Sequence, residues 1–155
     1  VLFRTKMRRA GRWTLMLAAA AVILAIVVPV ALDRAMGAAK QAGECRLLRI
    51  LDADRYRVTC DIVGRQTVRL LGADTPAALA PQCWAEFQAG MRAKWAVRAR
   101  LWSASEVDVS LDGFGWRDAP LAIVEADEER LSGWLVAENR GRIDDGYGRG
   151  GWCSG

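Results

Sequence analysis

An uncharged apolar run near the N-terminus, Trp13 to Leu32, constrains this chain more than any other feature. At 1.5 Å per residue these 20 residues would form a helix about 30 Å long, which matches the hydrocarbon core of a bilayer. Five basic side chains precede the run within residues 1–12, whereas Asp33 and Arg34 follow it with opposite charges. This asymmetry predicts a cytoplasmic N-terminus and an extracytoplasmic remainder.

The chain therefore divides into a basic tail (1–12), a membrane anchor (13–32), a linker (33–44) and a folded domain (45–155). A signal peptide is the alternative to the anchor, because the small residues at 35–39 resemble a cleavage site. Cleavage there would release a secreted domain. A buried helix of a soluble protein is disfavoured, since no polar face interrupts the run.

The basic character of the chain belongs mainly to its N-terminal part. Of the 22 Lys and Arg residues, six lie in residues 1–39, which leaves 16 basic against 17 acidic side chains from Lys40 onward. Binding to nucleic acid normally requires a net basic surface, so only a local basic patch could supply it here. The absence of His excludes catalysis by a histidine.

All four cysteines, Cys45, Cys60, Cys83 and Cys153, follow the apolar run. An even number of cysteines in an exported domain favours two disulfides, for which three pairings are open. A hairpin turning near Ala53 would bring Cys45 opposite Cys60 and leave Cys83 for Cys153. A zinc site is the alternative, but the sequence has neither a CxxC motif nor a histidine.

Residue patterning predicts an α+β domain, mainly β, with five strands and two to three helices. Alternating and β-rich runs predict strands at 45–51, 55–62, 66–72, 106–113 and 120–126. Apolar spacing predicts helices at 83–103 and 128–139. Three strands, a helix, two strands and a helix is the order of a five-stranded OB-type barrel.

The longer predicted helix carries two side-chain sets. Its apolar stripe, expected to face the core, comprises Trp84, Phe87, Met91, Trp95 and Trp102. Its basic cluster, expected to face solvent, comprises Arg92, Lys94, Arg98 and Arg100.

Acidic residues at two predicted turns are candidate metal ligands. Asp52 and Asp54 lie in the first hairpin, and Asp74 follows the third strand. In a barrel these positions can converge on a hard oxygen site suited to Ca²⁺, and Arg69 on the third strand could bind a phosphate. The alternative is structural, because aspartates in turns commonly bond the local backbone and a strand arginine can simply face water.

Four segments together resemble the staphylococcal-nuclease-like (thermonuclease) family. ILDADRYRV at 50–58 is similar to its V-x-D-G-D-T turn, and VRLLGADTPA at 68–77 is similar to its R-L-L-G-x-D-T-P-E motif. LDGFGWRDAPLAIV at 111–124 is similar to D-x-Y-G-R-x-L-A. The run from Leu131 to Cys153 resembles the final helix and the Gly/Arg-rich tail of small exported bacterial members.

The resemblance implies an OB-type fold and Ca²⁺-dependent hydrolysis of DNA or RNA phosphodiesters. Asp54 and Asp74 match the metal-binding aspartates, and Arg69 matches the first phosphate-binding arginine. The expected general base, a glutamate, is replaced by Ala77, and the expected second arginine is replaced by Trp116.

Two residues are candidates to compensate: Arg117, one position late, and Glu86 on the first helix of the domain. Loss of a general base costs about 10²–10⁴-fold in rate, and loss of a transition-state charge donor costs a comparable factor. The leading interpretation is therefore an anchored thermonuclease-like domain with weak or lost activity and a residual binding role. An active extracytoplasmic nuclease and a protein-interaction module without a nucleic-acid role are the alternatives, and the oligomeric state stays open.

Overall fold

The computed structural model describes residues 2–115, 119–144 and 151–153, with side chains from Arg12 onward. It divides into two compact units, Val1–Leu32 and Asp33–Gly155. Trp116 and Arg117, two positions on which the sequence analysis depends, lie outside the described residues.

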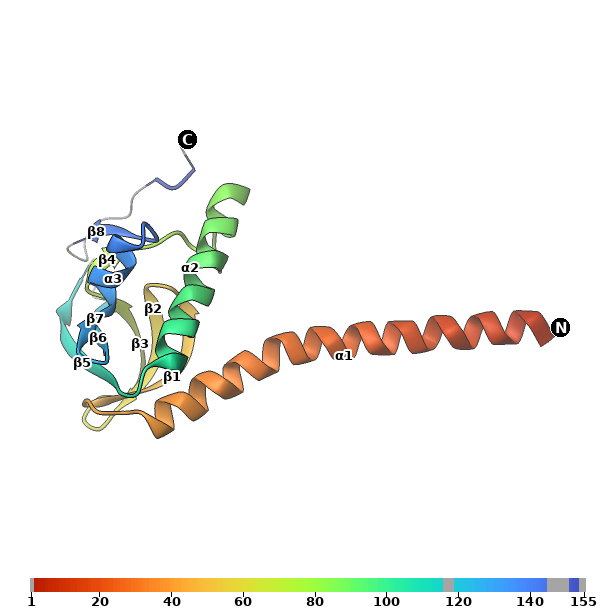
Figure 1. Ribbon diagram of the computed structural model, residues 1–155, viewed down its shortest axis with the longest axis horizontal. Coiled ribbons are helices and arrows are strands. Elements are labelled where there is room, and N and C mark those ends of the chain that lie inside the picture. Colours follow the sequence, from red (N-terminus) through yellow and green to blue (C-terminus); the bar gives the residue numbers. More distant parts are fainter. Residues whose placement is uncertain (1, 116–118, 145–150, 154–155) are drawn as a thin grey trace. The chain divides into compact units, whose positions relative to one another are not determined.

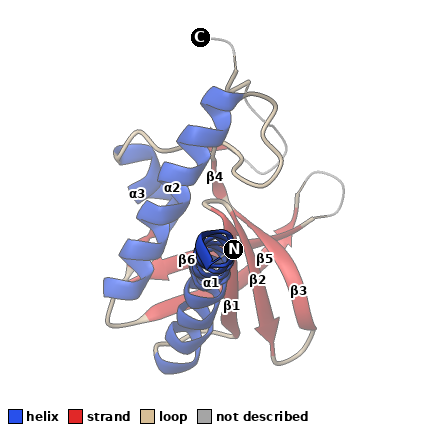
Figure 2. Cartoon of the chain, turned by 90° about the vertical axis from the view of Figure 1, so that its right-hand side faces the viewer, coloured by secondary structure: helices blue, strands red, loops and turns tan. Residues whose placement is uncertain are grey.

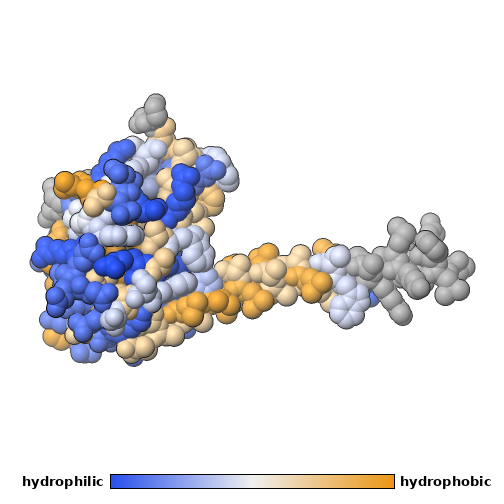
Figure 3. Space-filling view, viewed as in Figure 1, coloured by the Kyte–Doolittle hydropathy of each residue, from blue (hydrophilic) through white to orange (hydrophobic). Residues whose placement is uncertain are grey.

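The first unit consists of most of helix α1, Leu2–Ala39. Among the described residues, this is the one helix whose length and apolar composition suffice to cross a membrane, over 12–39; a signal sequence meets the same criteria. Its apolar side chains, including Trp13, Leu17 and Ile23, are exposed along the helix (Figure 3). An N-terminal apolar helix of spanning length is thus present.

The last turns of α1 belong to the folded unit. Asp33 and Met36 are buried there, and a Cβ on Gly37 would lie 2.0 Å from the Leu47 carbonyl oxygen. Lys40 follows and accepts a backbone hydrogen bond from Val107 at 2.8 Å. The segment 33–44, expected to be a linker, therefore begins as packed helix. The burial of Asp33 could not be predicted from the sequence pattern, because a single acidic residue after an apolar run is normally exposed to solvent.

The folded unit is built on a mixed sheet in the order β1-β2-β3-β6-β5, with β7 paired to β6 (Figure 1). The strands are β1 (Cys45–Asp52), β2 (Arg55–Cys60), β3 (Gly64–Leu70), β5 (Val107–Phe114), β6 (Pro120–Ala126) and β7 (Glu129–Arg130). Strands β1 to β3 form an antiparallel meander, and β3 pairs with β6 in parallel.

The α+β class and the strand segments agree with the sequence analysis, but a closed barrel is not found. Strands β1 and β5 lie close together, yet no hydrogen-bonded ladder joins them among the described residues. In the described part of the chain, an isolated β-bridge pairs Gln41, which precedes β1, with Val107 at the start of β5. The edge of β1 is instead covered by the end of α1.

Two helices and a small second sheet complete the unit (Figure 2). Helix α2 (Trp84–Ser103) is capped by Cys83, and α3 (Leu131–Ala137) follows β7. Helix α3 is shorter than the predicted 128–139, because Asp127 and Glu128 adopt positive φ angles of 52° and 67° and the next two residues pair with β6. Strands β4 (Gly72–Asp74) and β8 (Arg142–Asp144), neither of them predicted, form the second sheet.

Helix α2 presents a different face to the core than its aromatic stripe predicts. Trp84 is 69% exposed and Trp95 is 43% exposed. The buried residues are Glu86, Gly90, Ala93, Lys94, Val97, Arg98 and Leu101. Gly90 explains why this face of α2 is the buried one, since a Cβ at position 90 would lie 2.6 Å from the Ala77 carbonyl carbon. The close approach of α2 requires small residues, so the prediction of a core-facing stripe is wrong for Trp84 and Trp95, whereas Trp102 does pack against the core. The prediction of solvated Lys94 and Arg98 is also wrong, because both are buried.

Both disulfides join the cysteines that the hairpin argument pairs. Cys45 lies opposite Cys60 in the β1–β2 register, and the two are bonded. Cys83 is bonded to Cys153, which ties the start of α2 to the C-terminal segment 70 residues later.

Candidate functional site

The three principal candidate residues, Asp54, Asp74 and Arg69, converge at one end of the sheet. The Leu70 amide donates to the Asp54 carbonyl at 2.8 Å, which holds the β1–β2 turn against the end of β3. Gly72 then takes a φ of 96°, a conformation suited to glycine, and the chain turns into β4 with Asp74. All three side chains are buried, with exposures of 1%, 3% and 8% respectively.

The Arg69 guanidinium is the centre of an ion-pair network. Its Nη2 atom lies 2.9 Å from Asp74 Oδ1 and 2.9 Å from Asp144 Oδ2. Its Nε atom lies 3.6 Å from Asp54 Oδ2. The sequence predicts the convergence of Asp54, Asp74 and Arg69. It gives no signal for Asp144, which lies in the glycine-rich tail and follows no periodic pattern.

The C-terminal segment covers this network. Asp144 reaches it because β8 pairs with β4 in the register Gly72↔Asp144. The Trp152 indole Nε1 donates to Asp74 Oδ2 at 3.0 Å. The Arg142 guanidinium lies over the Trp152 ring, 4.0 Å from its centroid. The Cys83–Cys153 disulfide holds this segment in place next to Trp152.

Asp52 has a structural role rather than a ligand role. Its Oδ1 accepts hydrogen bonds from the Ala78 and Leu79 amides at 3.0 and 3.1 Å. Its Oδ2 accepts from Arg55. The carboxylate thus fixes the segment after Pro76 to the β1–β2 turn, through amides 26 and 27 residues away and not through the local backbone that the structural alternative expects.

Ala77 stands where the resemblance expects a glutamate, and Glu86 does not take over its position. The Ala77 amide donates to Glu86 Oε1 at 3.2 Å, and the Gln82 amide donates to Glu86 Oε2 at 2.6 Å. Glu86 is 7% exposed. Its carboxylate is therefore engaged in closing the loop 77–82 onto α2.

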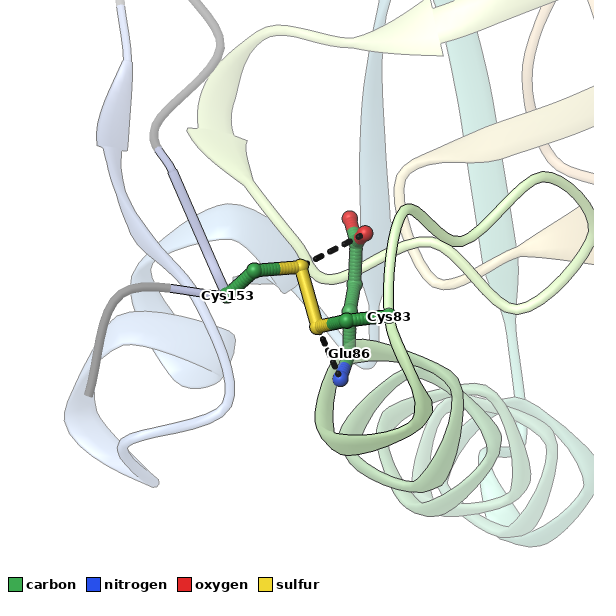
Figure 4. Close-up of side chains that lie close together, drawn as sticks. All are labelled: Cys83, Glu86 and Cys153. Atoms are coloured by element: carbon green, nitrogen blue, oxygen red, sulfur yellow. Dashed lines mark hydrogen bonds between the residues drawn. A yellow bond between two sulfur atoms is a disulfide. The ribbon is translucent and has the colours of Figure 1, made fainter.

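Glu86 also lies beside the disulfide, as Figure 4 shows. Cys153 Sγ is 3.8 Å from Glu86 Oε2, and Cys83 Sγ accepts from the Glu86 amide at 3.4 Å. These three side chains have the spacing of a metal site. Because both sulfurs are bonded to each other, neither is a thiolate, which is the form that coordinates a metal.

A polar cavity of about 120 Å³ adjoins the network. It is lined by Asp74, Thr75, Ala80, Gln82, Glu86, Gly151 and Trp152. The Thr75 hydroxyl is buried and has no hydrogen-bond partner among the described residues. Ordered water is the simplest occupant of a polar cavity of this size.

Tyr56 adds to the electrostatics beneath the network. The ring is fully buried in the core, and its hydroxyl donates to the Ala53 carbonyl. Burial, followed by the nearby charges of Asp54 and Asp52, raises the pKa of Tyr56 well above its ordinary value. Tyr56 is therefore a neutral hydrogen-bond donor that supports the turn carrying both aspartates.

The donor set supplies only part of what a Ca²⁺ ion requires. Asp54 and Asp74 offer the hard oxygens that Ca²⁺ prefers, but the ion takes six to eight such ligands. Here the Arg69 guanidinium contacts both carboxylates, so a cation at the same place would face its positive charge at short range. This arrangement fits an internal ion-pair network better than a Ca²⁺ site.

The chain was compared with known proteins. No protein-family model matches it, and no curated protein shows significant similarity to it.

Proposed function

We propose that this protein is a membrane-anchored, extracytoplasmic thermonuclease-like domain with an OB-type core, whose phosphodiesterase site has become an ion-pair network. On this proposal the domain acts as a binding module rather than as an enzyme. The strand order β1-β2-β3-β6-β5, with a helix between the third and fourth main strands, supports the OB-type assignment.

The observation that carries the proposal is the engagement of Arg69. A phosphate-binding arginine must have donors available to the phosphate, because charge develops on the phosphoryl oxygens in the transition state. Arg69 instead contacts Asp54, Asp74 and Asp144. With Ala77 at the position of the base, the described residues offer no uncommitted phosphate-binding arginine at this network and no general base.

The extracytoplasmic and membrane-anchored parts of the proposal rest on two features. The two disulfides are typical of oxidising compartments. The apolar helix is preceded by basic residues, which favours a cytoplasmic N-terminus.

The test is a cleavage assay with the full chain in detergent micelles. Fluorogenic single-stranded DNA and RNA are incubated over a Ca²⁺ titration, with Asp54→Ala as the matched variant and circular dichroism as the check of folding. We expect background cleavage with both proteins. Calcium-dependent cleavage that disappears in Asp54→Ala would replace the proposal with an active extracytoplasmic nuclease.

A further inference from the structure

Four arginines lie on the outer side of the β1–β2–β3 meander, and we call this surface the arginine face. Strand alternation places them there, because the pairs Leu47↔Val58 and Ile50↔Tyr56 point into the core and the intervening pair points outward. The members are Arg46, Arg49, Arg57 and Arg65. None of them forms an ion pair with a carboxylate of the described residues.

The strand register brings positive charges of the arginine face next to each other, which is electrostatically unfavourable in the isolated domain. Arg49 lies directly opposite Arg57. Arg46 and Arg65 flank Thr59, one on each neighbouring strand. Like charges directly opposite each other destabilise a sheet, so the arrangement calls for a compensating anion. The domain therefore carries a local basic patch even though its net charge is close to zero.

The anion that suits this face is a phosphate that is not part of a nucleic acid. Non-specific binding of single-stranded nucleic acid combines basic side chains with aromatic rings on which bases stack. The aromatic side chain that β2 contributes, Tyr56, is fully buried. Among the described residues of the folded unit, the large exposed aromatic side chains are Trp84, Trp95 and Phe114, on α2 and β5.

The arginine face begins close to the last turns of α1, residues 33–39, which belong to the folded unit. Asp33 directly follows the predicted span, and Gly37 is four residues later, about 6 Å along a helix. The Gly37 backbone packs against Leu47, the residue next to Arg46. A short connection along the chain therefore joins the predicted span to Arg46.

We propose that the arginine face binds the anionic headgroups of the membrane in which α1 is anchored. The inference rests on the anchoring stated under the proposed function. A guanidinium matches a phosphate with two parallel hydrogen bonds and stays charged at any physiological pH. Phosphatidylglycerol, which carries a net negative charge, is the lipid class that would neutralise the Arg49–Arg57 repulsion.

The test uses the full chain in nanodiscs of phosphatidylcholine alone or of phosphatidylcholine mixed with phosphatidylglycerol. The rate of phenylglyoxal modification is measured by mass spectrometry at the exposed arginines Arg46, Arg57 and Arg65. Arg92, exposed on α2, is the internal control. We expect modification of the three residues to be about fivefold slower in the anionic discs, with Arg92 unchanged. In 1 M salt the difference should vanish, because the Debye length falls to about 3 Å.

Two variants sharpen the result. Arg57→Gln should restore modification of Arg46 and Arg65 in anionic discs, whereas Arg92→Gln should not. Equal rates in both kinds of disc overturn the proposal. Protection by an oligonucleotide in phosphatidylcholine discs, without protection by phosphatidylglycerol, assigns the face to nucleic acid instead. A chain that does not co-elute with discs refutes the anchor itself, whereas co-elution without protection refutes the arginine face and leaves the anchor standing.

Discussion

Arg69 Nη2 lies 2.9 Å from Asp144 Oδ2, although 75 positions separate the two residues. The same nitrogen lies 2.9 Å from Asp74 Oδ1, so one guanidinium joins β3, β4 and β8. The pairing is possible because β8 aligns beside β4 and the tail is bonded to the start of α2. A residue with the sequence context of a phosphate ligand is thereby committed to holding the C-terminal segment.

The first prediction concerns this network. Arg69→Met should lower the free energy of unfolding by about 3–5 kcal/mol, because it leaves buried carboxylates beside one another without their shared cation. Arg130→Gln is the matched control. It removes the exposed pair with Glu125 and should change stability by no more than about 1 kcal/mol. Urea unfolding of both variants in micelles measures the difference, and equal midpoints would refute the assigned role of Arg69.

The second prediction concerns the disulfide of the C-terminal segment. Replacing both Cys83 and Cys153 with Ala should cost about 2–5 kcal/mol, because the bond constrains a long loop in the unfolded chain. It should also raise hydrogen exchange at β8, whose amides pair with β4. The Cys45–Cys60 double variant is the control, since its bond lies far from β8 in sequence. Unchanged exchange at β8 in the first variant would contradict a tail held by that bond.

The third prediction concerns Ala77, which stands where the thermonuclease resemblance expects a glutamate. Ala77→Glu should not create nuclease activity and should lower the free energy of unfolding by about 2–4 kcal/mol, because Ala77 is 3% exposed and its amide bonds to the Glu86 carboxylate. Ala80→Glu, at an exposed position of the same loop, should change stability by less than about 0.5 kcal/mol. Thermal unfolding measures the change in stability, and the fluorogenic cleavage assay measures nuclease activity. A stable and active Ala77→Glu protein would show that one substitution silenced the site.

The fourth prediction concerns the end of α1. Asp33 accepts hydrogen bonds from Arg98, from the Trp102 indole and from the Ile50 amide. Asp33→Ala should cost about 3–5 kcal/mol because it leaves Arg98 charged and buried. Arg34→Gln, at the exposed neighbouring position, should stay within about 0.5 kcal/mol of the parent. Denaturant titrations compare the free energies of unfolding of the two variants. An Asp33→Ala protein as stable as the parent would show that residues 33–39 act as a linker.

The fifth prediction concerns pH. The pKa of Tyr56 is raised in the folded protein, so the folded state holds its proton more tightly than the unfolded state does. The resulting stability is complete below the ordinary value of 10.0 and is lost as the pH rises from there toward the folded pKa. Absorbance titration of Tyr147→Phe, which leaves Tyr56 as the one tyrosine, should show no ionisation at pH 10 until the protein unfolds. Ionisation with an ordinary midpoint in the folded protein would contradict the burial of Tyr56.

Much of the β-structure followed from local pattern. The β-rich runs on either side of the turns at 52–54 and 64–65 were sufficient to predict the β1–β3 meander, and the hairpin turn then placed Cys45 opposite Cys60. The convergence of Asp54, Asp74 and Arg69 was also predictable, because strand ends and turns bring them to one end of the sheet. These inferences depend on the two-residue period of strands, which acts over a few residues.

The sequence by itself determined the apolar N-terminal helix, the strand segments and the absence of a glutamate after Pro76, since each depends on residue type or short-range periodicity. Only the tertiary structure decided which face of α2 is buried, because the approach of Gly90 to Ala77 depends on a contact 13 positions away. The tertiary structure likewise decided the ion-pair partners of Asp33 and Asp144, because the sequence around each of these two residues gives no indication of a partner. Each becomes a buried partner of an arginine more than 60 residues distant, and no local pattern carries information over that separation.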